Sequence, residues 1–188
     1  MQNLIAHIKK SINLSPLDCD AITSGTKLIN LKKKDFLLEE GRICKANYFV
    51  SKGCLRMFFI NHKGVEQITQ FAIENWWISD YMSFSKQTAS LFYIQAVEDS
   101  DILALSLSDQ EHLLTKVPKL ERYFRLNMQR ALGAAQQRVK FSHDFSKEES
   151  YRHFIASFPS FVQRIPQYML ASYLGLTPEY LSELRKKD

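Results

Sequence analysis

The sequence predicts an α+β fold in which an antiparallel sandwich or barrel of jelly-roll type is followed by a long helix and a helix-turn-helix. Residues 27–106 alternate short apolar runs with turn signals, and residues 118–143 repeat apolar side chains at helical spacing. Residues 166–187 form two short helical patterns around a glycine. Repeated short strands with tight turns are typical of antiparallel sandwiches and barrels. We expect three parts, at residues 1–114, 115–145 and 146–188.

The composition is that of a globular chain with enough apolar surface for one good core. Of the 188 residues, 45% are hydrophobic and 12% aromatic, and no apolar run approaches the roughly 18 residues needed to cross a bilayer. The first ten residues lack a signal-peptide pattern, so we expect a cytoplasmic protein with no membrane partner. The three dispersed cysteines, Cys19, Cys44 and Cys54, favour neither a disulfide framework nor a zinc site.

Two amino-terminal helices precede the strands. The stretch NLIAHIKKSI has helical spacing, and a second helix begins after Ser15, which can cap it. Pro16 suits its first position and Asp18 suits its positive end. The strand candidates are the runs KLINLKK, NYFVSK, CLRMFFI, VEQITQF, FYIQAVE and DILALS.

The helical period returns after residue 106. Ser108 and Glu111 have the spacing of a capping box, and Pro118 opens the long helix. Its apolar stripe comprises Leu120, Phe124, Met128, Ala131, Ala135 and Val139. The stripe either packs on the chain's own sheet or forms a seam with a second helix, and both can hold on different faces.

The last forty residues predict three more helices. Ser146 and Glu149 form another capping box, whose helix ends before Pro159. Residues 159–166 are expected to be a loop or short wing. The final two helices are predicted at Pro166–Leu174 and Pro178–Lys187.

The junction between these last helices has the residue pattern of a helix-turn-helix. Ala171 allows close helix approach, Gly175 can adopt positive φ, and Leu176 can fill the core between the helices. Thr177 caps the second helix and Pro178 opens it. The helices are expected to be pinned together by Leu170, Leu174, Leu181 and Leu184. An ordinary αα-hairpin would explain the same residues, so this pattern leaves both interpretations open.

If the motif binds DNA, the helix from Pro178 enters the major groove. Base edges would then meet Thr177, Glu179, Tyr180 and Glu183. Phosphates would be held by Arg185, Lys186 and Lys187, with Gln167 and Ser172 touching the backbone. The net charge of +5 is concentrated in residues 115–146, which hold seven Lys and Arg against two Asp and Glu. Two glutamates on a groove-facing helix repel phosphate, so affinity should depend on dimerisation and on this basic segment.

The order of strand cluster, long helix and helix-turn-helix resembles the Crp/Fnr superfamily of bacterial transcription regulators. The resemblance rests on EEGRICKANYFVSKGCLRMFFINHKGVEQ, IQAVEDSDILALS and LASYLGLTPEYLSELRKK. It implies a cyclic-nucleotide-binding-like domain with the double-stranded β-helix fold and a dimerising central helix. The homodimer would bind double-stranded DNA, with RNA polymerase as a candidate partner. The dimer interface would include Phe124, Met128, Ala131, Ala135 and Val139.

The expected effector pocket departs from the nucleotide-sensing members. Ser79-Asp80 stands where they carry Gly-Glu, and Ser90-Leu91 where they carry Arg followed by Ser or Thr. Asp80 can still accept a ribose hydroxyl, but the phosphate loses its bidentate guanidinium partner. We therefore expect a degenerate pocket without useful affinity for cyclic AMP, either holding another, less anionic effector or filled by Tyr93 or Trp77.

Other functional classes find little support. Three dispersed cysteines cannot supply the four thiolates of an iron–sulfur cluster. The histidines are scattered and no nucleophile elbow appears, so no enzyme activity, catalytic residue, metal site or cofactor is expected. The remaining alternative is a ligand-binding or scaffolding module that does not bind DNA. The effector, the operator, the direction of regulation and the regulated genes cannot be read from the sequence.

Overall fold

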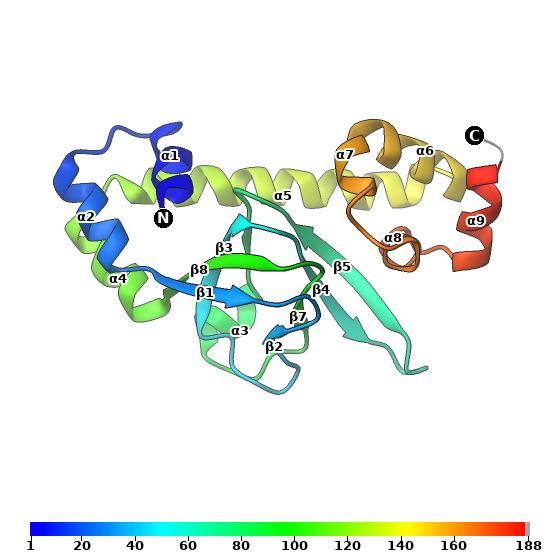
Figure 1. Cartoon of the computed structure of the whole chain (residues 1–188), viewed down its shortest axis with the longest axis horizontal. Helices are drawn as coiled ribbons and strands as arrows, with labels where there is room; N and C mark the ends of the chain where they lie inside the picture. Colours follow the sequence, from blue (N-terminus) through cyan, green and yellow to red (C-terminus); the bar gives the residue numbers. More distant parts are fainter. Residues whose placement is uncertain (187–188) are drawn as a thin grey trace. The chain divides into compact units, whose positions relative to one another are not determined.

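The structure is a computed structural model that describes residues 1–186 (Figure 1). The chain forms two compact units. The first comprises Met1–Phe59 and Gln70–Asn127, and the second joins Ile60–Thr69 to the chain from Met128 onward. Within the described residues no helix is long and apolar enough to cross a membrane. The division at residues 114/115 and 145/146 stays a prediction.

The first unit is built on two four-stranded antiparallel sheets. One sheet has the order β1-β8-β3-β6 and the other the order β2-β7-β4-β5. The first contains β1 (Lys27–Leu31), β8 (Ser100–Ser106), β3 (Ala46–Lys52) and β6 (Trp77–Ile78). The second contains β2 (Phe36–Leu38), β7 (Tyr93–Ala96), β4 (Leu55–Ile60) and β5 (Glu66–Ala72), whose beginning belongs to the second unit.

Strand β3 shows why these segments read as continuous apolar runs. Tyr48 and Val50 pack into the cluster between the sheets. Phe49, between them in sequence, points the other way into a second cluster. Because side chains alternate across a strand, a strand covered on both faces is apolar at every position.

Helices cover the outer face of the first sheet. They are α1 (Gln2–Lys9), α2 (Pro16–Ser24), α4 (Leu107–Lys116) and the start of α5 (Leu120–Asp144), side by side in Figure 1. The fully buried Tyr123 of α5 joins them to the sheet. Its hydroxyl lies 2.8 Å from Nδ1 of His7 and accepts a hydrogen bond from Nε1 of Trp77, also at 2.8 Å.

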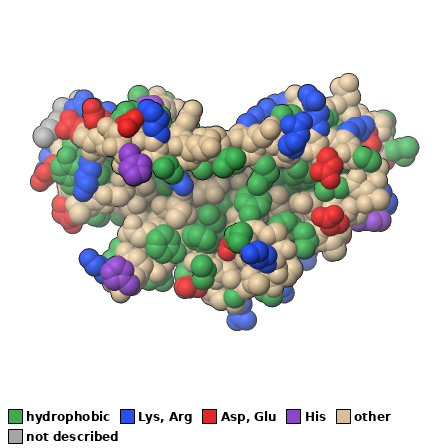
Figure 2. Space-filling view, turned by 180° about the vertical axis from the view of Figure 1, so that it is seen from behind, with side chains coloured by type: hydrophobic (Ala, Val, Ile, Leu, Met, Phe, Trp, Pro, Cys, Tyr) green, Lys and Arg blue, Asp and Glu red, His purple; other side chains and the backbone are tan. Residues whose placement is uncertain are grey.

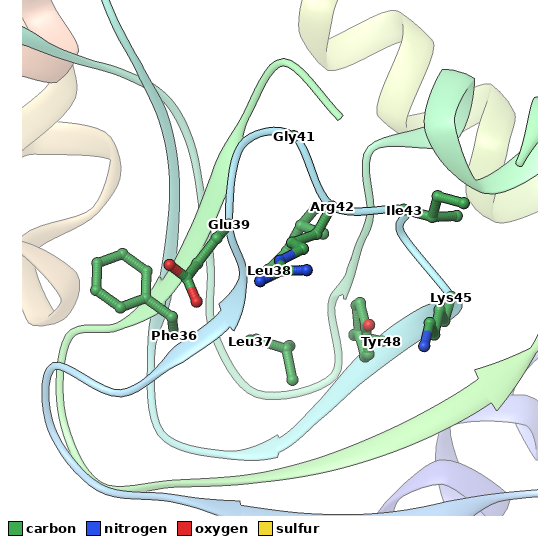
Figure 3. A pocket seen from close by; sticks show the side chains of 9 residues that line it. All are labelled: Phe36, Leu37, Leu38, Glu39, Gly41, Arg42, Ile43, Lys45 and Tyr48. Atoms are coloured by element: carbon green, nitrogen blue, oxygen red, sulfur yellow. The ribbon is translucent and has the colours of Figure 1, made fainter. Parts of the chain in front are cut away.

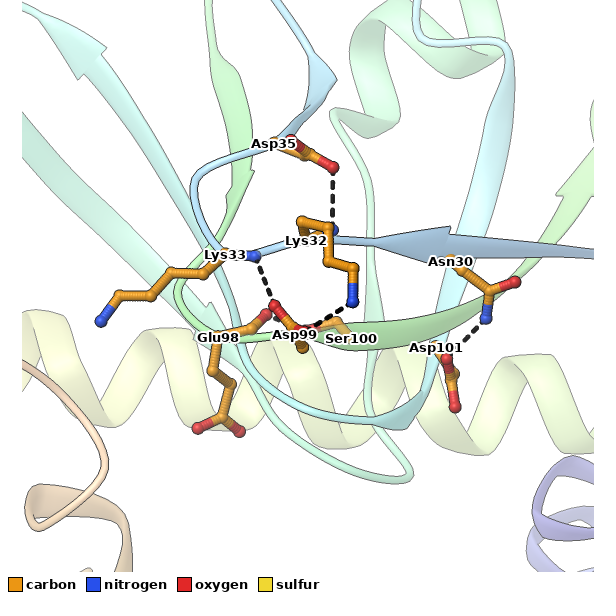
Figure 4. Close-up of polar contacts among 8 residues, drawn as sticks. All are labelled: Asn30, Lys32, Lys33, Asp35, Glu98, Asp99, Ser100 and Asp101. Atoms are coloured by element: carbon orange, nitrogen blue, oxygen red, sulfur yellow. Dashed lines mark hydrogen bonds and ion pairs between the residues drawn. The ribbon is translucent and has the colours of Figure 1, made fainter.

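Two turns at one end of the sheets are held by polar contacts (Figure 4). The Asp99 carboxylate accepts the amide of Lys33 at 2.8 Å and pairs with Nζ of Lys32 at 3.0 Å. These contacts, the Lys33 amide first, lower the pKa of Asp99. Next to this turn Gly53 has a φ of +97° and approaches Ser100 so closely that a Cβ would lie 2.2 Å from the serine Oγ. Only glycine fits this position without a shift of the neighbouring turn.

The second unit contains the end of α5, the tip of the β4–β5 hairpin and four short helices. Those helices are α6 (Lys147–Ser157), α7 (Pro159–Val162), α8 (Gln167–Leu174) and α9 (Pro178–Lys186). The predicted capping box of Ser146 and Glu149 is confirmed in both of its hydrogen bonds.

The predicted α+β architecture is confirmed, with local corrections. The six predicted strands form as expected, but the short elements β2, β6 and α3 (Tyr81–Lys86) are additional. The predicted capping box of Ser108 and Glu111 is wrong. Ser106 caps α4 by accepting the amide of Asp109, because the chain is still extended at Ser106 and turns helical at the next residue. The loop predicted at residues 159–166 is only partly correct, because Pro159–Val162 form the short helix α7 and residues 163–166 remain non-helical.

Candidate functional site

The turn between α8 and α9 depends on Gly175. Its φ of 66° is left-handed, and its amide ends α8 on the carbonyls of Ala171 and Ser172. The amide of Leu176 then returns to the carbonyl of Ala171 at 2.8 Å. This reversal, which L side chains disfavour, redirects the chain into α9. The predicted role of Gly175 is thus confirmed.

A small apolar core holds the two helices together. Leu181 and Ala171 are fully buried, and Leu174, expected among these contacts, is only half-buried. The core is completed by Leu170, Leu176, Leu184, Met169, Ile165 and Phe161. The buried positions of α9 therefore leave its remaining side chains on an exposed face.

Helix α9 begins as the sequence predicts and presents charged residues. Oγ1 of Thr177 accepts the amide of Tyr180 at 3.2 Å, and Pro178 occupies the first helical position. Tyr180 is half-buried, whereas the exposed side chains are Thr177, Glu179, Ser182, Glu183, Arg185 and Lys186. Ser182 was not among the predicted residues, although its position follows from the helical period. Lys187, a predicted phosphate contact, lies outside the described residues.

Acidic and basic side chains are intermingled on the carboxyl-terminal helices in the face that Figure 2 shows. Helix α9 carries Glu179 in its first turn and Arg185 and Lys186 in its last. The amino-terminal half of the helix is the part that reaches bases in helix-turn-helix proteins. The two cations lie at the other end of the helix.

The two predicted contacts on α8 differ in availability. Gln167 is exposed. The hydroxyl of Ser172 is already engaged, because it donates to the Glu66 carbonyl at 2.9 Å and accepts the Ile68 amide at 3.0 Å. Both partners lie at the tip of the β4–β5 hairpin, which belongs to the same compact unit. Nothing in the sequence signals this contact, which joins residues about a hundred positions apart.

Arg138 of α5 adds a second connection to the same hairpin. Its guanidinium donates to the Thr69 carbonyl and lies 5.5 Å from the ring centroid of Tyr173 in α8. The Tyr173 ring in turn packs on Phe154 of α6, with centroids 5.4 Å apart. One arginine therefore ties together the long helix, the hairpin and the first helix of the motif.

The apolar stripe predicted on α5 divides into two parts. Phe124 packs within the first unit, with its ring 5.6 Å from Trp77 and 5.2 Å from Tyr123. Met128 and Val139 are exposed by 46% and 58%, and Ala131 and Ala135 are exposed as well. Leu132, which is not part of the predicted stripe, is 62% exposed on the same face. Exposed apolar side chains at this spacing are typical of a helix that packs on another helix.

The expected effector segment, residues 76–96, is closed by its own hydrogen bonds. Asp80 caps α3, because its Oδ1 accepts the amides of Met82 and Ser83 at 3.1 Å. Its Oδ2 accepts the hydroxyl of Ser90 at 2.8 Å. Ser79, Asp80 and Ser90 are buried, whereas Leu91 is 71% exposed. Asp80 and Ser90 thus come together, whereas the Ser79 hydroxyl donates to the Ala46 carbonyl of β3 at 3.1 Å and Leu91 stays at the surface.

Trp77 and Tyr93, the two bulky side chains expected to fill the pocket, make other contacts. Trp77 belongs to the outer cluster beside α5. Tyr93 stacks on Phe58, with ring centroids 5.0 Å apart. The buried Arg56 lies nearby on β4, where Nε and Nη2 donate to the Gln95 side chain at 3.0 and 2.6 Å. The buried guanidinium of Arg56 is therefore paired with a protein group.

Comparisons with known proteins agree on one family. Residues 28–116 match the cyclic nucleotide-binding domain family. The chain is 27% identical over 177 residues to the transcriptional regulatory protein btr of Bordetella pertussis, covering 84% of this chain and 72% of that protein. It is 25% identical over 169 residues to the anaerobic regulatory protein of Haemophilus influenzae, covering 82% of this chain and 63% of that protein, less than two thirds of its length.

Solved structures share the fold at low identity. FixK2 of Bradyrhizobium japonicum has a TM-score of 0.74 at 15% identity, covering 86% of this chain and 83% of FixK2. The catabolite activator protein of Thermus thermophilus has a TM-score of 0.60 at 20% identity, covering 96% of this chain and 85% of that protein. Residues 28–116 thus match the cyclic nucleotide-binding domain family, and the chain as a whole is similar to regulators and solved structures of the Crp/Fnr type.

Proposed function

We propose that the chain is a DNA-binding transcriptional regulator whose helix α9 enters the major groove. The observation that carries this proposal is the capped turn at Gly175, which buries Leu181 and Leu184 of α9 and exposes its opposite face. The helix-turn-helix uses this arrangement to insert its second helix. The curated relatives are themselves named as regulators.

The test is binding to the DNA immediately upstream of the gene, measured by fluorescence anisotropy at several salt concentrations. Phosphate contacts release counterions, so affinity should fall steeply between about 50 and 200 mM salt. Replacing Arg185 and Lys186 by alanine should weaken binding and reduce the salt slope by up to about two units for each bound subunit. The matched control is Lys9→Ala with Lys10→Ala, which removes two exposed charges from the first unit.

A scaffolding module that does not bind DNA is the second candidate, favoured by the mixed charge of α9. It predicts affinity that does not depend on salt, or no binding to upstream DNA at all. Equal binding by the Arg185 and Lys186 double variant and by its control would also favour the scaffold. The salt titration therefore separates the two candidate functions. The regulator predicts DNA affinity that falls steeply with salt, and the scaffold predicts affinity that does not change or no binding.

The regulator is further proposed to act as a homodimer through the exposed stripe of α5. Apolar side chains at Met128, Leu132 and Val139 are each about half-exposed or more, and such a stripe is stabilised when a second helix covers it. A two-fold dimer would also present two copies of α9 to DNA. This doubling would compensate for the unfavourable glutamates on the helix.

The effector segment is proposed not to bind cyclic AMP. Ser90 hydrogen-bonds Asp80 and carries no positive charge, so a buried phosphate there would lack the guanidinium that compensates for its desolvation. Calorimetric titration of the intact protein with cyclic AMP should give no heat of binding. Micromolar affinity would contradict this proposal without affecting the one for DNA.

A further inference from the structure

A cleft in the first unit lies outside the segment that the family uses for nucleotides. Its volume is about 610 Å³, and it opens between β2 and the beginning of β3 (Figure 3). It is lined by Phe36, Leu37, Leu38, Glu39, Gly41, Arg42, Ile43, Lys45 and Tyr48. No lining residue belongs to residues 76–96. The volume lies within the range of about 300–1,000 Å³ that is typical of small-molecule sites.

Tyr48 brings a polar atom to this cleft without an internal partner. Its side chain is only 6% exposed and otherwise belongs to the core between the sheets. Among residues 1–186 its hydroxyl makes no hydrogen bond. The hydroxyl is not among the fully buried side-chain atoms that lack a partner in the described residues, so it reaches solvent in the cleft and can donate a hydrogen bond to a ligand there. Burial, with a smaller effect of Cys44, raises the pKa of Tyr48, and the phenol therefore stays a hydrogen-bond donor.

The charges of the cleft favour an anion. Arg42 and Lys45 line it, and neither makes an ion pair with any residue that the structure describes. Glu39 lies toward Phe36 in Figure 3, apart from Lys45 and Tyr48. Guanidinium and ammonium groups form their strongest hydrogen bonds with carboxylates and phosphates. An anionic group therefore fits between Arg42, Lys45 and Tyr48.

The walls of the cleft favour an apolar body on the same ligand. Phe36 and Ile43 leave 45% and 40% of their surfaces exposed, although both have large apolar side chains. Leu37 and Leu38 continue this wall along β2. Small-molecule sites are usually apolar with a few polar groups that set orientation. The lining of this cleft has that composition.

The backbone at Arg42 is connected to the effector segment. The Arg42 carbonyl accepts the amide of Ser90 at 2.8 Å, and the Gly41 amide donates to the Ser90 carbonyl at 2.9 Å. Ser90 is the residue that bonds Asp80, the cap of α3. A ligand held by Arg42 would therefore lie next to the two backbone hydrogen bonds that connect residues 41–42 to Ser90.

We infer that this cleft binds a small organic anion, in which a carboxylate or phosphate ester is attached to an apolar body. Arg42 and Lys45 hold the anionic group, Tyr48 donates a hydrogen bond to it, and Phe36 and Ile43 contact the apolar part. This inference goes beyond the proposed regulator, and it holds whether or not the chain binds DNA.

The test is a ligand-detected NMR titration of the intact protein with phenyl phosphate, benzoate and benzyl alcohol. The first two share an aromatic body and carry a phosphate ester or a carboxylate, whereas the third is uncharged. At least one anion should bind about tenfold or more tightly than the alcohol, and the ratio of the two anions identifies the preferred group. Failure of both anions to bind at about 10 mM would overturn the inference.

Variants locate the binding within the cleft. Arg42→Gln and Lys45→Gln should each weaken anion binding by about tenfold. Tyr48→Phe should weaken it by about fivefold, with the melting temperature showing that the core stays intact. Lys52→Gln, which removes an exposed cation from the far end of β3, should leave binding unchanged. Equal affinity in all four variants would place the anion elsewhere and overturn the inference.

Discussion

The hydroxyl of Ser172 in helix α8 accepts the backbone amide of Ile68 in the β4–β5 hairpin, at a distance of 3.0 Å. The same hydroxyl donates to the Glu66 carbonyl two residues earlier. One side-chain hydroxyl of the helix-turn-helix therefore satisfies two backbone groups of β5, the Ile68 amide and the Glu66 carbonyl. The sequence predicts that Ser172 contacts the DNA backbone. In this structure its hydroxyl is already bonded to the hairpin.

Replacing Ser172 with alanine should release the Ile68 amide. A neutral hydrogen bond contributes about 1 kcal/mol, which corresponds to about fivefold in local opening. Hydrogen exchange of the Ile68 amide should accelerate by about that factor. Ser182→Ala, at an exposed position of α9, should leave the exchange rate unchanged.

DNA affinity at a fixed salt concentration tests the other role of the same residue. If the hairpin retains the hydroxyl, Ser172→Ala leaves the DNA affinity unchanged while Ile68 exchange accelerates. A loss of affinity of about tenfold or more would show that Ser172 contacts a phosphate, as the sequence predicts. Unchanged exchange would mean that the Ser172–Ile68 hydrogen bond does not protect this amide in solution.

Two glycine-to-alanine substitutions should have opposite signs. At Gly175 the left-handed φ of 66° disfavours a Cβ, so Gly175→Ala should lower the free energy of unfolding by about 1–2 kcal/mol. At Gly133, inside α5, a Cβ meets nothing within 4 Å. Gly133→Ala should therefore raise the free energy of unfolding by up to about 1 kcal/mol, the difference in helix propensity.

Urea titration followed by circular dichroism measures both effects. Gly53→Ala serves as a severe reference, because its Cβ would lie 2.7 Å from Cβ of Ser100 as well as close to the Asp99 carbonyl. It should destabilise the fold more than Gly175→Ala. An unchanged or raised stability for Gly175→Ala would contradict the geometry of the α8–α9 turn.

Local patterns predicted the elements whose signals lie within a few residues. The cap at Ser15, the capping box at Ser146, the left-handed Gly175 and the apolar run of β3 all follow from neighbouring residues. The capping box at Ser108 failed for a similar reason. Two overlapping capping patterns were present, and the end of strand β8 decided in favour of Ser106.

Long-range contacts were beyond the reach of the sequence. The β2 strand has only three residues, and its pairing with Tyr93–Ala96 depends on partners sixty positions away. The cleft at Tyr48 is lined entirely by residues 36–48, but no residue pattern within this stretch indicates a cleft. The contact of Ser172 with the hairpin is also long-range. A serine on a helix does not indicate from the sequence which distant group it will bond.

Asp18 gives a prediction about acid stability. Hydrogen bonds from Lys119 and then from Ser15 lower its pKa to about 2, below the value near 3.9 expected in an unfolded chain. Its charge therefore stabilises the folded state fully above about pH 4, and this contribution is lost as the pH falls toward 2. Asp18→Asn should melt at a lower temperature than the original chain at pH 7, with the difference shrinking at low pH.

The control for this effect is Asp20→Asn in the same helix. Asp20 is exposed and makes no ion pair with a described residue. Its replacement should not reproduce the pH-dependent difference. If Asp18→Asn and the original chain have the same melting temperature at every pH, the ion pair between Asp18 and Lys119, at 2.6 Å, contributes nothing measurable to stability.

The stripe on α5 gives the last prediction, which separates dimerisation from folding. Leu132→Glu places a charge among Met128, Ala135 and Val139, at a side chain that is 62% exposed in the single chain. Light scattering at micromolar concentration should then report a mass near 21.9 kDa, while the melting temperature of the β-domain stays unchanged. Burying an unpaired charge in a helix interface is unfavourable.

Two variants complete this experiment. Gln137→Glu, on the opposite side of the helix, adds the same charge and should leave the dimer intact. Phe124→Ala should instead lower the free energy of unfolding by about 3 kcal/mol or less, since the ring is only partly buried against Trp77 and Tyr123. A dimer that survives Leu132→Glu would show that the two copies meet elsewhere, because this substitution opposes any seam formed by the exposed stripe.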